Sequence, residues 1–150
     1  MPALPFRNLP LAPRNRPWNE SKALQRVKEW ATSDGSGDEA QIDWAKFRRA
    51  FFWYDPNAAK NIDGYHLLFC DVIDGVLTAS PRGIRAAGES VKGRQERGGM
   101  SGPLVAAIRA QISRYYRKMS LSFHDRTIVT PWRQAEQDAA NARLKRAVSV

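Results

Sequence analysis

Aromatic residues gather in one stretch of the chain, residues 43–83, and this stretch limits the possible folds more than any other. It holds two of the five tryptophans and four of the six phenylalanines. Four of its aromatic residues recur at spacings of three, four and three, as on one face of a helix: Trp44, Phe47, Phe51 and Tyr54. Asp43 stands where it can cap such a helix, and Asp55-Pro56 would end it. The pattern predicts a helix whose aromatic face packs into the core.

A hairpin and further helices are predicted around this aromatic helix. Residues 66–71 and 76–80 flank Asp74-Gly75, a dipeptide typical of a two-residue hairpin turn. Apolar periodicity predicts helices over residues 19–31, from Pro81 to about Val91, and from Pro103 to about Met119. The fold class expected is α+β and mostly helical, with about four helices around a small β-hairpin and an extended N-terminal arm. The residues expected in the core are Trp44, Phe47, Phe51, Tyr54, Phe69, Ile108, Ile112 and Tyr115.

Three regions are expected along the chain. Residues 1–17 hold five of the nine prolines and form an extended arm, because prolines this dense block both helix and central strand. Residues 18–119 form a single α+β domain, and residues 120–150 form an extended segment and a C-terminal helix. The arm is rich in large apolar residues and is expected to dock on a surface, either of its own domain or of a neighbour. A frayed N-terminus is the alternative. The arm residues expected to bind a partner are Leu4, Phe6, Arg7, Leu9, Leu11, Arg14 and Arg16.

The net charge of +9 is unevenly distributed along the chain. Residues 1–81 hold ten Lys and Arg and ten Asp and Glu, whereas residues 82–150 hold fourteen and five. An excess of this kind indicates an acidic partner, either a nucleic acid or an acidic protein surface. A solvated basic face with no dedicated partner is the alternative. The basic surface is expected to comprise Arg82, Arg85, Arg94, Arg97, Arg114, Arg117 and Lys118.

The titratable residues form no recognisable catalytic pattern. His66 and Cys70 are four residues apart and His124 is distant, whereas a structural zinc site needs four ligands, so no metal site is predicted. A nucleophilic cysteine would have to be Cys70, but a neighbouring Asp71 would raise the pKa of the thiol. We therefore predict a protein that is not an enzyme and needs no cofactor, with Cys70, His66 and Asp71 as the one conceivable catalytic group.

Three further features of the sequence indicate the cellular compartment. The chain has no run of 18 apolar residues that could cross a membrane, and its N-terminus lacks the continuous apolar segment of a secretory signal. Its single cysteine, Cys70, cannot form an internal disulfide. These features predict a protein of a reducing compartment.

Four motifs of the chain, taken together, resemble a domain of tailed-phage head proteins. The motifs are WAKFRRAFFWYDP at residues 44–56, GYHLLFCDVIDGVL at residues 64–77, PRGI at residues 81–84 and YYRKM at residues 115–119. In phages, this domain commonly follows the protease domain of prohead (head-maturation) proteases, and it also occurs alone. The resemblance covers residues 18–119 and includes no protease domain, so it implies no protease activity and no catalytic residues.

The resemblance implies a non-enzymatic structural protein of the phage head, such as a capsid-bound decoration, cement or minor head protein, that docks through its arm and basic surface. The expected partner is the major capsid protein or another head protein, within a symmetric assembly and without a membrane. The expected location is the virion, and the host cytoplasm during assembly. A basic nucleic-acid-binding module is the alternative function, and DNA is accordingly the second candidate partner.

Overall fold

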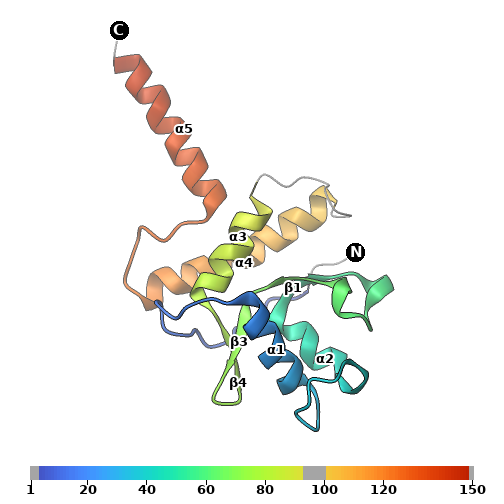
Figure 1. Cartoon of the computed structure of the whole chain (residues 1–150). Helices are drawn as coiled ribbons and strands as arrows, with labels where there is room; N and C mark the ends of the chain where they lie inside the picture. The colour runs from blue at the N-terminus through green and yellow to red at the C-terminus, as the bar shows by residue number, and fades with distance from the viewer. Residues whose placement is uncertain (1–3, 93–100, 149–150) are drawn as a thin grey trace.

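The computed structural model describes residues 4–92 and 101–148, and in these ranges the chain forms five α-helices and two antiparallel β-hairpins (Figure 1). In chain order the elements are α1 (Glu20–Ala31), α2 (Trp44–Phe47), β1 (Phe51–Tyr54), β2 (Tyr65–Leu68), β3 (Cys70–Ile73), β4 (Val76–Ala79), α3 (Pro81–Val91), α4 (Gly102–Ser122) and α5 (Pro131–Val148). The predicted class, α+β and mostly helical, is confirmed. The β1–β2 hairpin is an addition that the sequence pattern did not predict.

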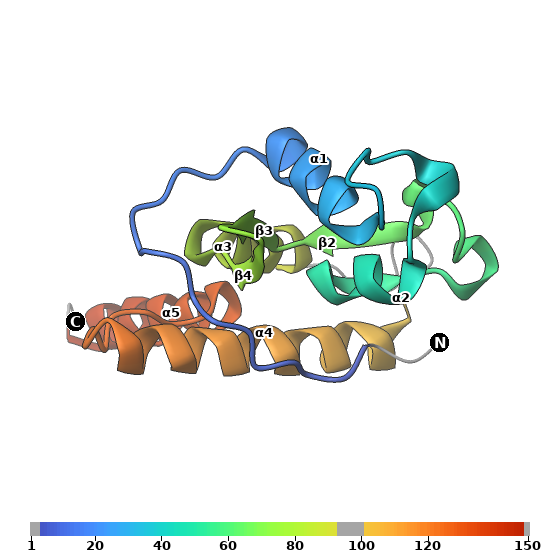
Figure 2. The same cartoon turned by 90° about the horizontal axis from the view of Figure 1, so that it is seen from below.

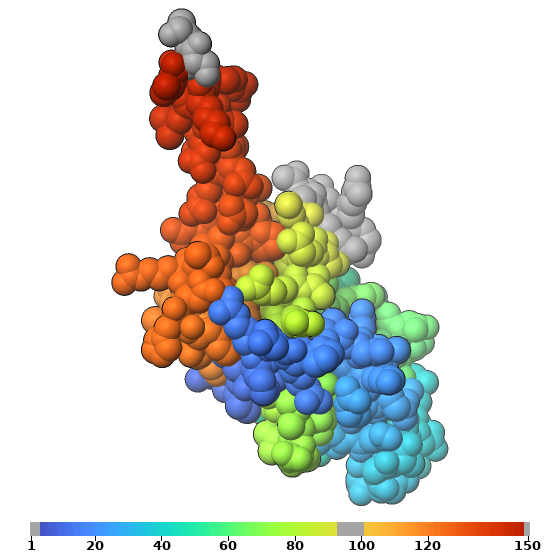
Figure 3. Space-filling model, turned by 60° about the vertical axis from the view of Figure 1, so that its left-hand side comes forward, coloured from blue at the N-terminus to red at the C-terminus, as the bar shows by residue number. Residues whose placement is uncertain are grey.

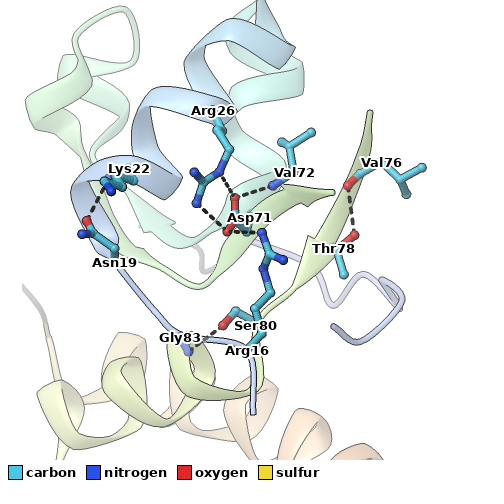
Figure 4. Close-up of polar contacts among 10 residues, drawn as sticks. All are labelled: Arg16, Asn19, Lys22, Arg26, Asp71, Val72, Val76, Thr78, Ser80 and Gly83. Atoms are coloured by element: carbon cyan, nitrogen blue, oxygen red, sulfur yellow. Dashed lines mark hydrogen bonds and ion pairs between the residues drawn. The ribbon is translucent and has the colours of Figure 1, made fainter. Parts of the chain in front are cut away.

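Helices α1, α3 and α4 lie where the sequence predicts them, and each begins at a capping side chain. Asn19 Oδ1 accepts the backbone N–H of Lys22 at 3.1 Å at the start of α1. Ser80 Oγ accepts the N–H of Gly83 at 3.1 Å at the start of α3 (Figure 4). Ser101 caps α4 in the same way. Each cap satisfies an N–H that the first helical turn cannot pair internally, which fixes where the helix begins.

The predicted aromatic helix is wrong beyond its first turn. Helix α2 covers only Trp44–Phe47, and after a single 3₁₀ turn at Arg48–Ala50 the chain extends into β1. Four consecutive aromatic residues favour a strand. Three of them are buried, whereas a helix packed on one side would bury a single stripe. The rings still cluster as the spacing suggested, because Phe47 and Phe51 meet with centroids 4.9 Å apart.

The hairpin predicted at Asp74-Gly75 is confirmed, although its first strand begins later than expected. Strands β3 and β4 pair antiparallel along all four residues of each strand. Asp74 has φ 51° and Gly75 has φ 78°, and two successive left-handed residues are the signature of a type I′ turn, whose twist matches that of the flanking strands. The predicted strand at residues 66–71 is divided, because its residues up to Leu68 belong to β2 and pair with β1.

The two hairpins lie between helices (Figure 2). Helix α1 packs on β3 on one side, while α4 passes along β1 on the other and packs against α3. At the centre Phe52 and Phe69 stack with centroids 3.9 Å apart, and Tyr115 of α4 meets their rings at 6.1 and 5.2 Å. Of the eight residues expected in the core, Trp44 and Tyr54 are half-buried at its edge. The other six are buried: Phe47, Phe51, Phe69, Ile108, Ile112 and Tyr115.

The C-terminal region differs in part from the prediction. Residues 120–130 were expected to be extended, but α4 continues through Ser122 before the chain turns at His124. The predicted last helix is confirmed as α5, which projects from the rest of the molecule (Figures 1 and 3). None of the helices in the described ranges is both long enough and apolar enough to span a membrane.

Candidate interaction surface

The N-terminal arm docks on the body of its own chain, where it runs along α4 (Figure 2). Leu4 and Leu9 are buried, and Leu9 belongs to the main hydrophobic core. Phe6 is half-buried against Tyr115, with ring centroids 5.0 Å apart. Leu11 forms a parallel bridge with β4, so the arm adds one extended residue pair to the β3–β4 hairpin. The apolar residues of the arm therefore pack against their own domain.

Polar side chains fix the backbone of the arm at the same time. Helix α4 donates three hydrogen bonds to carbonyl groups of the arm: Gln111 to Leu4, Tyr115 to Arg7 and Lys118 to Leu9. Burial raises the pKa of Tyr115 to about 12, so its hydroxyl keeps the proton that it donates. These bonds matter because a proline-rich segment cannot pair its own carbonyls in a helix or sheet.

The arginines of the arm also bind to groups of the body. Three contacts hold them: Arg7 donates to the Phe51 carbonyl at 2.8 Å, Arg14 pairs with Asp125 at 2.6 Å, and Arg16 pairs with Asp71 at 3.4 Å. Of the two expected docking surfaces, the structure has the arm on its own domain. The arm residues expected to bind a partner thus lie against their own chain, and binding of a partner by them stays a prediction.

Asp71 joins the arm, α1 and the β3–β4 hairpin (Figure 4). Its side chain is 2% exposed and accepts from Arg26 Nε at 2.7 Å, from a second Arg26 nitrogen at 2.9 Å and from Arg16 at 3.4 Å. Burial alone would raise the pKa of Asp71, but the hydrogen bonds from Arg26 and from the Val72 N–H, with the two positive charges, hold it below its ordinary value. Asp71 is therefore an ionised structural anchor.

The residues considered for catalysis do not converge on a site. Cys70 is fully buried, and this burial raises the pKa of its thiol far above the ordinary value, so it is not a thiolate nucleophile at neutral pH. His66 lies on β2 and stacks on Trp53, with ring centroids 4.6 Å apart, while His124 is exposed after α4. Within residues 4–92 and 101–148, no three His, Cys, Asp or Glu side chains gather as metal ligands.

The basic residues expected at the surface are only partly brought together. Arg82 and Arg85 are exposed on α3. Arg94 and Arg97 lie outside the described residues. The remaining three lie on the C-terminal half of α4 and form the first part of the candidate surface: Arg114, Arg117 and Lys118.

These three α4 cations line a groove of about 530 Å³ between the arm and α4, which we call the arm groove. Its lining residues are Phe6, Asn8, Arg114, Arg117, Lys118, Leu121 and Ser122. The guanidinium of Arg114 lies 3.9 Å from the centroid of the Phe6 ring, a cation–π contact that holds it in place. Lys118 is half-buried and donates to Asn8 at 2.7 Å, so it mainly tethers the arm. None of the described residues lining this groove carries a carboxylate.

A second groove of about 570 Å³, the helix groove, lies between α4, the loop that follows it and the first turns of α5. Arg117 and Leu121 line both grooves, which makes them the ridge between the two. The helix groove adds Arg126 and Arg133 to the positive surface, and Glu136 is the carboxylate in its lining. All four arginines of the two grooves are exposed.

Helix α5 is exposed on nearly every side. From residue 133 to residue 148, all residues are exposed except the half-buried Ala140. The start of the helix is anchored on the body: Pro131 is buried close to Gly88 of α3, and the guanidinium of Arg109 lies 5.2 Å from the centroid of the Trp132 ring. An isolated helix of this length is only marginally stable in water. Helix α5 therefore has the most to gain, among the described elements, from a partner surface.

Sequence reasoning missed Arg126 and Arg133. Each stands alone in its local sequence, and the path of the chain from α4 into α5 is what brings them beside Arg117. No family model, curated protein or solved structure matches this chain. Its function is therefore inferred from the geometry of these surfaces and from its own motifs.

Proposed function

We propose that this chain is a non-enzymatic structural protein of a phage head that docks on a neighbouring head protein through α5. The observation that carries the docking is the exposure of α5, which stands out from the body and buries little beyond its first residue (Figure 3). The resemblance of residues 18–119 to a phage head domain supports the setting. The partner proposed is the major capsid protein or another head protein, contacted in the virion by copies that follow the symmetry of the shell.

Docking through α5 fits the energetics better than docking through the arm. The arm would have to break its contacts with α4 and β4 before it could bind a neighbour, whereas residues 133–148 of α5 are already exposed apart from the half-buried Ala140. Leu144 and Val148 are 64% and 82% exposed. A fully exposed aliphatic side chain contributes about 1.5–3 kcal/mol when it is buried completely. Scaled by the exposed fractions of Leu144 and Val148, burying both against a partner would contribute about 2–4 kcal/mol in total.

Truncation after Trp132 tests this proposal. It removes the exposed part of α5 and leaves Pro131 and Trp132 in their packed positions, so the body should stay folded by circular dichroism. Mass spectrometry of purified phage particles should then show full-length chain at a fixed ratio to the shell protein and the truncated chain strongly depleted. Truncated chain at the full-length ratio would refute docking through α5.

A pair of point variants separates a specific contact from a general effect of added charge. Leu144→Glu places a carboxylate on α5, and Val76→Glu places one on the β-hairpin, where Val76 is also exposed, at 53%. We expect Leu144→Glu to reduce particle association several-fold and Val76→Glu to leave it unchanged. An equal reduction by both variants would mean that α5 is not the docking element.

A further inference from the structure

We propose that the arm groove and the helix groove together bind the phosphate backbone of a nucleic acid. Four exposed arginines line the two grooves: Arg114, Arg117, Arg126 and Arg133. None of the four forms an ion pair within the described part of the chain, where the paired arginines are Arg14, Arg16 and Arg26. Among the described lining residues of the two grooves, Glu136 is the one carboxylate. In the described lining of the two grooves, four arginines thus face a single carboxylate, which leaves a positive excess there.

The two grooves form one path across α4. They adjoin at Arg117 and Leu121, which line both, so a chain of phosphates lying in the arm groove can continue over this ridge into the helix groove. Hydroxyl groups are available on each side of the ridge, from Ser122 in the arm groove and from Ser113 in the helix groove. Hydroxyls and guanidinium groups are common donors to phosphate oxygens in nucleic-acid complexes.

The kind of cation favours a phosphate ligand over a carboxylate-bearing protein. All four available cations are arginines, whose planar fork donates two parallel hydrogen bonds to a phosphate and is less strongly hydrated than an ammonium group. Arg114 is already positioned by the Phe6 ring. The four arginines are spread over both grooves and the ridge between them. Charge spread along a path in this way fits a polyanion with regularly spaced charges, read without regard to base sequence.

Fluorescence anisotropy on the full chain tests the inference, with a labelled 20-nucleotide single strand of DNA and a labelled 20-base-pair duplex as the two probes. Four phosphate contacts predict that raising the salt from 50 to 200 mM weakens binding about 50-fold for the single strand and about 150-fold for the duplex. The triple variant Arg117→Gln, Arg126→Gln and Arg133→Gln retains one contact. Its affinity should be lower at 50 mM salt and should fall only about threefold over the same range.

A second triple variant controls for overall charge. It removes three positive charges, the same number as the groove variant, from exposed positions outside the two grooves: Lys22→Gln, Arg49→Gln and Lys60→Gln. This control should bind both probes like the unaltered chain and keep its salt dependence. An equal loss of affinity in both triple variants would overturn the proposal, because binding would then follow total charge rather than the grooves.

Two other results would also overturn it. Absence of binding to either probe at 50 mM salt would leave no nucleic-acid site. The second result is that polyglutamate, at the same concentration of charge as the DNA, displaces the probe and that the groove variant binds both polyglutamate and DNA more weakly. It would assign the surface to an acidic protein. Particle association through α5 is measured separately, so failure of the nucleic-acid site leaves the proposed function untouched, and the reverse also holds.

Discussion

Replacing Leu9 with alanine tests whether the arm is part of the folded body. The Leu9 side chain is 5% exposed and lies in the main core. Its backbone is held independently, because its N–H donates to the Tyr115 hydroxyl at 3.3 Å and its carbonyl accepts from Lys118 at 2.5 Å. The substitution therefore removes side-chain packing alone. A buried leucine replaced by alanine costs about 2–5 kcal/mol, and because the arm lies at the surface and can settle into the gap, we expect about 2–3 kcal/mol.

Urea unfolding followed by tryptophan fluorescence measures this loss of stability, and a thermal melt should show a midpoint lowered by about 4–12 °C for a chain of this size. Leu144→Ala is the matched control, because Leu144 is 64% exposed on α5 and its loss should change the free energy of unfolding by less than about 0.5 kcal/mol. If Leu9→Ala were as stable as the control, the arm would not be docked on the body in solution, and the intramolecular role given to it would be refuted.

Three further predictions concern the buried polar groups. Tyr115→Phe removes the donor to the Arg7 carbonyl and should lower the free energy of unfolding by about 1–2 kcal/mol in urea titrations; no change would show that this bond does not tether the arm. Asp71→Asn should cost about 2 kcal/mol at pH 7, less than a fully buried pair, because its arginine partners are 33% and 40% exposed and can be rehydrated. Since the pKa of Asp71 is lowered on folding, the carboxylate contributes its full stabilisation above the unfolded pKa of about 3.9 and loses it as the pH falls through the folded pKa. The free energies of unfolding of the variant and of the unaltered chain should therefore converge in acid. A constant difference between them down to about pH 2 would contradict this. Cys70 should react with a thiol reagent only as fast as the chain unfolds, and rapid stoichiometric labelling of the native protein would show that the thiol is accessible.

The elements that sequence reasoning predicted well are those whose pattern is local. Helix α4 buries Leu104, Ile108, Ile112, Tyr115 and Met119, which are spaced by three or four residues and so reveal one helical face. The β3–β4 turn was equally readable, because few dipeptides other than Asp-Gly adopt two left-handed residues in succession at low cost. In both cases the signal and the structure it specifies lie within a few residues of each other.

The prediction of a long helix in the aromatic stretch was wrong because the deciding signal is not local. In β1, four aromatic residues follow one another, so the helical spacing of Phe51 and Tyr54 was satisfied by a sequence that equally suits a strand. What decides between the two is β2, a partner strand that begins eleven residues after Tyr54 and pairs with it through Tyr65. That pairing is a tertiary contact, and local periodicity does not encode it.

The candidate surface was predicted only where it follows one helix. Arg114, Arg117 and Lys118 share the C-terminal half of α4 and could be grouped from the sequence. Arg126 and Arg133 reach the same surface through the turn after α4 and the start of α5. The docking of the arm on its own domain was likewise one of two open alternatives, since apolar residues among prolines indicate that a segment docks but not on which molecule.

The central claim is that α5 binds a partner while the arm packs on the body of its own chain. Hydrogen exchange measured by mass spectrometry, on the free chain and on assembled phage particles, tests this claim most directly. We predict that amides of residues 133–148 exchange rapidly in the free chain and become protected in the particle, whereas the Leu9 and Ala12 amides, which donate to the body, are protected in both. Rapid exchange of the arm in the free chain with new protection there on assembly, and no change in α5, would contradict the account.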